Sequence, residues 1–287
     1  MRLPTQLLRR KPESNKGDYG HIFILAGSMN YSGAAVLCAQ AAMRSGAGSV
    51  RLGIPKGINN AIIKIKPEEV MTLPLPETKS GSLSGKAFDK IKVFVKKFDI
   101  LVIGPGLSQD KATQALTRRI ISVIDKPMII DADGLNALAG HLNILRKPKA
   151  NNRSLILTPH PGEMARLLGI TVNIVQKNRK DIACKFSRCH KLTLILKGHN
   201  TIVSDAKGKI YINRTGNPGM SSAGSGDVLT GMISAFLGQG LDSFSSAKYA
   251  VYLHGLAGDL AAKEKTQISL IASDIIAKIP EAIKKSS

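Results

Sequence analysis

The 287-residue sequence has no tryptophan, only 4% aromatic residues and no apolar run as long as a membrane span. The scarcity of aromatic side chains argues against a surface that stacks on nucleic-acid bases, and the lack of a long apolar run is typical of a soluble globular protein. The amino terminus is basic, but Pro4 and Pro12 interrupt the helix that a transit peptide needs. We therefore expect a cytoplasmic protein with no targeting signal.

Cysteine is also scarce. Cys38, Cys184 and Cys189 are an odd number of thiols, which favours reduced thiols over a disulfide framework. Cys184, Cys189 and His190 stand close together in the sequence, but no second ligand pair at a matching spacing follows them. Thiols on a helix are a better interpretation of this cluster than a metal site.

Acidic residues are half as numerous as basic ones: 20 Asp and Glu stand against 41 Lys and Arg, which gives a net charge of +21. Such a charge attracts polyanions, phosphorylated metabolites or anionic lipids without choosing among them. The basic residues are scattered rather than gathered in one block, which is typical of a solvated surface. We expect no specific nucleic-acid partner and no membrane association.

The order of apolar segments predicts an α/β fold in one domain, residues 1–287. Residues 100–103, 128–130 and 155–157 are apolar on both faces, as parallel strands covered by helices require. Two alternating runs flank residues 206–208 and predict a small antiparallel hairpin at one edge of the sheet. Helical periodicity follows in residues 224–240, 244–263 and 271–285, and we interpret residues 73–87 as a loop. The prediction is a mostly parallel central sheet with helices on both faces.

Ligands of open α/β sheets lie beyond the carboxyl ends of the strands, and five conspicuous segments fall there. They are "AGSMNYSGAA" (26–35), "IGPGLSQD" (103–110), "IDADGLNAL" (130–138), "LTPHPGE" (157–163) and "LKGHNT" (196–201). Each segment also has an alternative interpretation in which it binds no ligand. His160 could be an incidental exposed histidine, Lys197 a solvated lysine, and Asp131 and Asp133 could cap a helix instead of organising magnesium.

A sixth segment, "NPGMSSAGSGDVLTGM" (217–232), leads a glycine-rich loop into a predicted helix. Gly224, Ser225 and Gly226 leave backbone N–H groups free to form an anion hole at the helix start. The helix dipole favours the ionised form of Asp227, which could accept a proton from a hydroxyl that is being phosphorylated, although an ordinary acidic helix cap is the alternative. Neither a Walker pattern nor Gly-x-Gly-x-x-Gly is present. Together the six segments indicate nucleotide-dependent phosphoryl transfer.

These segments, with "KGDYGHIFILAGS" before them and "YLHGLAGDLAA" after them, occur in the order typical of one family. From about Lys16 to about Pro280 the sequence resembles the ADP- or ATP-dependent NAD(P)H-hydrate dehydratases. The resemblance implies a ribokinase-like fold and repair of the S epimer of hydrated NADH or NADPH (NADHX or NADPHX). In that reaction the substrate hydroxyl is phosphorylated and phosphate is then eliminated, so that ADP yields AMP and phosphate.

The resemblance also implies roles for individual residues. Asp227 would be the catalytic base, with Gly224, Ser225 and Gly226 around the transferring phosphoryl group. The hydrated nicotinamide nucleotide would contact Ala34 or Ala35, Gly106, His160 and Asp227. The adenine nucleotide would contact Gly226 and the run Lys197, Gly198, His199, Asn200 and Thr201. Magnesium is expected, held either by Asp131 or by the nucleotide alone.

Family relatives imply partners as well. Many are fused to an epimerase domain that is not visible in this sequence, so we expect a separate NAD(P)HX epimerase, ADP rather than ATP as donor, and a homo-oligomer, a tetramer by analogy. The alternative within the fold is a vitamin-precursor kinase of the hydroxyethylthiazole or pyridoxal type, which would use the same anion hole and Asp227. "LTPHPGE" argues against that alternative.

Overall fold

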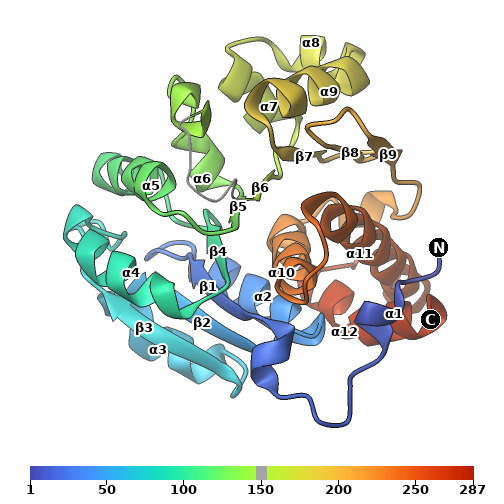
Figure 1. Ribbon diagram of the computed structural model, residues 1–287, viewed down its shortest axis with the longest axis horizontal. Helices are drawn as coiled ribbons and strands as arrows, with labels where there is room; N and C mark the ends of the chain where they lie inside the picture. The colour runs from blue at the N-terminus through green and yellow to red at the C-terminus, as the bar shows by residue number, and fades with distance from the viewer. Residues whose placement is uncertain (147–153) are drawn as a thin grey trace.

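The computed structural model describes residues 1–146 and 154–287. The strands of this part form one nine-stranded sheet in the order β3-β2-β1-β4-β5-β6-β7-β8-β9 (Figure 1). Neighbours from β3 to β7 are parallel, whereas β7, β8 and β9 pair antiparallel. The strands are β1 His21–Leu25, β2 Ser49–Pro55, β3 Val70–Leu75, β4 Ile100–Ile103, β5 Met128–Ile130, β6 Leu155–Leu157, β7 Thr193–Leu196, β8 Ile202–Ser204 and β9 Ile210–Ile212.

The predicted fold class is confirmed, and so are the three buried strands and the hairpin. β4, β5 and β6 have the predicted bounds and are buried throughout, because helices cover both of their faces. β8 and β9 form the hairpin around residues 206–208. The interpretation of residues 73–87 as a loop is wrong at its start, since Leu73–Leu75 end β3, an edge strand in which Pro74 needs no donor on its outer side.

One face of the sheet is covered by the helices that follow β1 and β2 and by the three carboxyl-terminal helices (Figure 1). The long helix α11 packs between its neighbours through alanine and glycine as well as larger residues. These helices are α2 Ser32–Arg44, α3 Asn59–Ile65, α10 Ser225–Gly238, α11 Ser243–Lys265 and α12 Ala272–Lys285.

The opposite face carries the helices from the middle of the chain, whose apolar residues form a second core against β1, β4, β5, β6 and β7. They are α4 Phe88–Phe94, α5 Lys111–Val123, α6 Asp133–Asn136, α7 Pro161–Leu168, α8 Val172–Lys177 and α9 Arg179–His190. The short helix α1, Thr5–Leu8, lies near the carboxyl terminus, where Leu3 N–H donates to Ser286 O at 2.8 Å (Figure 1).

The strand order reverses between β1 and β4. The chain passes from β1 to β2 on one side and from β4 to β5 on the other, so the loops after β1 and β4 diverge. Such a reversal opens a crevice at the carboxyl ends of the strands. The first turn of α2, which carries Ala34, and the loop that carries Gly106 lie at this crevice.

Candidate active site

Helix α10 begins at the predicted anion hole. Gly224 is its N-cap and has φ 89°, a left-handed conformation that glycine adopts without strain. Ser225 and Gly226 follow as the first two helical residues, and Asp227 is in the first turn. Ser225 N–H donates to Ser222 O in a long hydrogen bond of 3.4 Å. The N–H groups at a helix start and the positive end of the helix dipole favour a bound anion. The structure therefore places the four predicted catalytic residues at one helix terminus.

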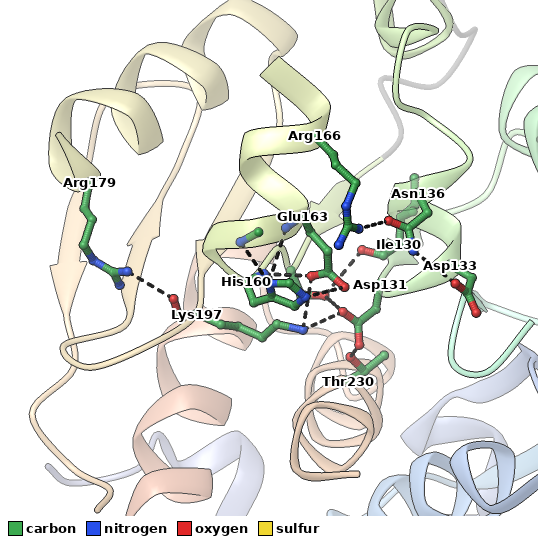
Figure 2. A network of polar contacts seen from close by, with 12 residues as sticks. Ile130, Asp131, Asp133, Asn136, His160, Glu163, Arg166, Arg179, Lys197 and Thr230 are labelled. Carbon is green, nitrogen blue, oxygen red and sulfur yellow. Dashed lines mark hydrogen bonds and ion pairs between the residues drawn. The ribbon is translucent and has the colours of Figure 1, made fainter. Parts of the chain in front are cut away.

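The ammonium group of a partly buried lysine, Lys197, lies beside this terminus. A β-carbon added at Gly226 would lie 3.3 Å from Lys197 Nζ, so the glycine leaves room for the lysine head group. Lys197 Nζ donates to Asp131 Oδ1 at 2.8 Å and lies 3.8 Å from Glu163 Oε2 (Figure 2). Because Lys197 is held by these two carboxylates, it is not the solvated lysine of the alternative interpretation. Its charge adds to the anion-attracting field of the helix start.

Asp131 neither caps a helix nor offers a free carboxylate. Its Oδ1 accepts from Lys197 Nζ and, at 2.7 Å, from Thr158 Oγ1, and its Oδ2 accepts from Thr230 Oγ1 at 2.7 Å (Figure 2). The neighbouring helix α6 has Ala132 as N-cap, with no side-chain cap. Lys197 and these hydrogen bonds keep the pKa of Asp131 low despite its complete burial, so it stays ionised.

The prediction that the helix dipole keeps Asp227 ionised at neutral pH needs correction. Burial and, after it, the charge of Asp131 raise the pKa of Asp227 to about 7, against the opposing effect of Lys197. The dipole acts only over the first turn and is outweighed by desolvation. A carboxyl with this pKa can accept and release a proton near neutral pH.

His160 has a structural partner that the sequence does not reveal. Its Nδ1 accepts from the N–H groups of Gly162 at 3.0 Å and Glu163 at 3.3 Å, which caps α7, and Glu163 Oε2 accepts from His160 N–H at 2.8 Å. Nδ1 is thereby unprotonated and Nε2 carries the proton of the neutral ring. Burial and the charges of Lys197 and Arg166 lower the pKa of His160. The ring remains half exposed and accessible to a ligand.

Gly106 and Ala34 meet at the crevice. Gly106 has φ 62°, and a β-carbon added there would lie 2.9 Å from Ala34 Cβ and 2.6 Å from Tyr31 O. Ser28 Oγ donates to Gly106 O at 2.8 Å and fixes the loop. Of the two predicted alanines, Ala34 is partly exposed and lies against Gly106, whereas the side chain of Ala35 is buried in the core.

The predicted nucleotide loop, residues 197–201, follows β7 and is largely exposed beyond Lys197. His199 and Asn200 are exposed, and Thr201 Oγ1 donates to Gly198 O at 2.9 Å. Arg179, which the sequence interpretation missed, donates to Leu196 O at 3.1 Å and Lys197 O at 3.2 Å. A basic residue at the start of a helix carries no distinctive sequence signal, so only the fold identifies this support for the loop (Figure 2).

Two further residues were missed. Thr230 reaches Asp131 from α10, and His254 reaches Ser225 from α11, with 3.4 Å between His254 Nε2 and Ser225 Oγ. His254 lies within "YLHGLAGDLA", a segment that carried the resemblance without a role for any of its residues. Burial lowers the pKa of His254 to about 4, so its ring is neutral.

The chain matches a known family over most of its length. Residues 22–281 match the family of NAD(P)H-hydrate dehydratases. The chain belongs to this family. Its fold is accordingly ribokinase-like, with the antiparallel strands β8 and β9 at one edge.

Some relatives of this chain are larger proteins, of which the chain matches only a part. The chain is 44% identical over 280 residues to the bifunctional NAD(P)H-hydrate repair enzyme of Moorella thermoacetica, covering 98% of the chain and 52% of that enzyme. It is 37% identical to the ADP-dependent (S)-NAD(P)H-hydrate dehydratase of Neisseria meningitidis, covering 96% of the chain and 88% of that protein. The chain thus spans about half the length of several curated relatives that it matches.

A solved dehydratase has the same architecture. The ADP/ATP-dependent NAD(P)H-hydrate dehydratase of Bacillus subtilis, co-crystallised with ATP and Mg²⁺, superposes with a TM-score of 0.83 at 32% identity, over 97% of this chain and 94% of that one. In this family member, nucleotide and magnesium were supplied together.

Within residues 1–146 and 154–287, no three His, Cys, Asp or Glu side chains gather as a metal site. Both oxygens of Asp131 already accept hydrogen bonds, and Asp133 Oδ2 accepts from Ser108 N–H at 2.8 Å. The carboxylates of Asp131 and Asp133 thus already accept hydrogen bonds from the protein. In the same part of the chain, no helix combines the length and apolarity that crossing a membrane requires.

Proposed function

We propose that this chain dehydrates the S epimer of hydrated NADH or NADPH, with ADP as the phosphoryl donor and ATP as the alternative donor. The observation that carries the proposal is the position of Asp227. This carboxyl lies in the first turn of α10, next to Gly226 and near the Lys197 ammonium, and burial raises its pKa to about 7. A base with that pKa beside an anion-binding helix start is suited to phosphorylating a hydroxyl.

In the proposed reaction Asp227 accepts the proton of the substrate hydroxyl while the hydroxyl oxygen attacks the terminal phosphorus of ADP. The bond from that phosphorus to the bridging oxygen breaks and AMP leaves. The ring nitrogen of the substrate then expels phosphate as the carbon–oxygen bond breaks, and loss of a proton from the adjacent carbon restores the reduced nicotinamide. Gly224 to Gly226 and Lys197 stabilise the charge on the transferring group.

The remaining predicted residues have supporting positions. Gly106 and Ala34, at the crevice between β1 and β4, would hold the nicotinamide nucleotide, and the half-exposed ring of His160 would contact it. The exposed loop of residues 197–201 would bind the adenine nucleotide. Magnesium, when bound with the nucleotide, neutralises phosphate charge. Asp131 is a poor candidate for its ligand, because both of its oxygens are occupied by donors.

The experiment is direct. Purified protein is incubated with hydrated NADH, magnesium and either ADP or ATP, and the return of reduced-nicotinamide absorbance is followed. We expect recovery that requires the nucleotide and is lost in Asp227→Asn. Asp89→Asn is the matched control, because Asp89 is also an acid in the first turn of a helix but is exposed on α4.

Failure to recover NADH with either nucleotide would contradict the proposal. Phosphorylation of hydroxyethylthiazole or pyridoxal by the same preparation would then favour the vitamin-precursor kinase. Pairing with an NAD(P)HX epimerase is also proposed, since the R epimer would otherwise accumulate, and adding such an epimerase should restore the part of a mixed hydrate that this chain leaves behind. The tetramer stays a prediction, which light scattering would test.

A further inference from the structure

The carboxyl ends of three neighbouring strands meet in one buried polar cluster. Asp131, Thr158 and Lys197 are the residues directly after β5, β6 and β7. Thr230 joins them from α10 (Figure 2). Asp131 is the acceptor for all three others, with Oδ1 bound to Lys197 Nζ and Thr158 Oγ1 and Oδ2 bound to Thr230 Oγ1.

We propose that Asp131 is a positioning residue: its carboxylate holds the Lys197 ammonium beside the first turn of α10 and, through Thr230, holds that helix against the sheet. The kinetic effects that we expect from this inference rest on the proposed function. Its structural consequences can be measured without any substrate.

Asp131 acts through other residues because no ligand can reach it. The residue is 1% exposed, and each oxygen already accepts at least one short hydrogen bond. Lys197, by contrast, lies at the boundary with solvent and next to Gly226. A long flexible lysine side chain has several rotamers, and a buried carboxylate with fixed geometry selects one of them.

The backbone after Asp131 is strained in a way that agrees with a fixed position. Ala132 has φ 47° and ψ −118°, in a region that residues with a β-carbon rarely adopt. Such conformations cost energy and persist where the surrounding structure holds them. Here the carbonyl of Asp131 also packs closely on Gly104, where an added β-carbon would lie 1.7 Å from Asp131 O.

The same carboxylate acts on Asp227 through its charge. Thr230 follows Asp227 by three residues on α10, so both face the same side of the helix and Asp131 lies beneath them. The charged groups that act on Asp227 are Asp131, Lys197, Asp133 and Glu163. Cys38 on α2 and His254 on α11 are neutral at pH 7, since burial raises the pKa of the thiol and lowers that of the imidazole. Removing the charge of Asp131 should therefore make Asp227 more acidic.

The first test is Asp131→Asn, with Asp89→Asn as the control for the same chemical change at an exposed site. We expect kcat/KM for ADP to fall roughly tenfold to a hundredfold, because Lys197 loses its position. The acid limb of the pH profile should move to lower pH by about one pH unit. A carbon-13 titration of the Asp227 carboxyl should show the same shift in the protein without ligands. An unchanged Asp227 titration in folded Asp131→Asn would overturn the proposal.

The second test is Thr230→Val, which removes the helix anchor and keeps the charge of Asp131. We expect kcat to fall and amide hydrogen exchange in the first turn of α10 to accelerate, while the Asp227 titration midpoint stays within about 0.3 pH unit of the wild type. Wild-type exchange and kcat in this variant would contradict the anchoring role, even if Asp131→Asn fails to fold. Wild-type protein that is inactive on hydrated NADH would instead refute the proposed function, while the carboxyl titration and the exchange measurement would still decide the role of Asp131.

Discussion

The Nε2 atom of His254 lies 3.4 Å from Oγ of Ser225, which joins the middle of α11 to the first residue of α10. A neutral imidazole can accept a hydrogen bond from this hydroxyl, whereas a protonated one cannot. A partly buried histidine therefore contacts the first residue of the predicted anion hole. We expect the stability of the fold to depend on the charge of that ring.

The first prediction concerns acid stability. The unfolded-state pKa of histidine is near 6.5 and burial lowers the pKa of His254 to about 4, so the unfolded state binds the proton first. The free energy of unfolding should fall as pH decreases from about 6.5 to about 4, by up to about 3 kcal/mol from this residue. His254→Gln keeps a neutral polar side chain and should lose this component. Urea unfolding at several pH values measures both proteins, and parallel pH dependences would contradict the prediction.

The second prediction separates the two roles of His160. His160→Ala should destabilise the protein by about 1 kcal/mol, because α7 loses the cap that Nδ1 provides. His160→Asn should retain most of that stability, since asparagine is a good N-cap. Both variants should raise KM for hydrated NADH if the imidazole contacts substrate. Thermal unfolding and steady-state kinetics distinguish the roles; a wild-type KM in His160→Asn would assign His160 to capping alone.

The third prediction uses two glycines at the same helical position. Gly226 and Gly33 are the second residues of α10 and α2, and each has a helical neighbour on both sides. Alanine should stabilise each helix by roughly 0.5 to 1 kcal/mol, but at Gly226 the added carbon would lie 3.3 Å from Lys197 Nζ, whereas at Gly33 it meets nothing within 4 Å. Gly226→Ala should therefore lose activity without losing much stability.

The control in this pair is Gly33→Ala, which should be more stable than the wild type. Circular dichroism on heating and the hydrated-NADH assay are sufficient measurements. Full activity in Gly226→Ala would show that the Lys197 ammonium can shift without consequence, against the geometry described here.

The fourth prediction is that Asp227→Asn is inactive yet more stable at pH 8. The carboxyl titrates near 3.8 when unfolded and near 7 when folded, so the folded state binds more protons between these values and loses stability as pH rises through them. Asparagine carries no such cost, and the gain at pH 8 is at most about 4 kcal/mol. Guanidinium unfolding of both proteins at pH 5 and pH 8 measures it. An equal stability difference at the two pH values would exclude the raised pKa.

Much of the fold was predictable from local pattern, and the exceptions have physical reasons. β4, β5 and β6 are short and entirely apolar, so composition alone marks them as buried parallel strands. β2 and β3 were not predicted, because Arg51 interrupts the first run and Pro74 the second. An edge strand tolerates proline, and a single basic residue at a half-buried position leaves the strand intact.

The candidate site was predictable in location and less so in electrostatics. Strand exits and glycine turns mark the loops of Gly106, His160 and Gly224 from sequence alone. The pKa of Asp227 depends on burial and on Asp131, which is 96 residues away in the chain and is brought close only by the fold. Thr230 and His254 lie in segments that carried the resemblance. Their helical pattern does not show which residues they contact, so only the fold reveals their hydrogen-bond partners.

The polar cluster at the carboxyl ends of β5, β6 and β7 depends on the number of residues in each strand. Asp131, Thr158 and Lys197 are the first residues after three paired strands, and side chains alternate between the two faces of a sheet. Deleting one residue within β5, β6 or β7 would turn the next polar side chain toward the opposite layer of helices. Inserting a residue into a loop at the amino ends of these strands would leave all three polar side chains in place. The chain can therefore vary in length at the amino ends of these strands far more readily than within them.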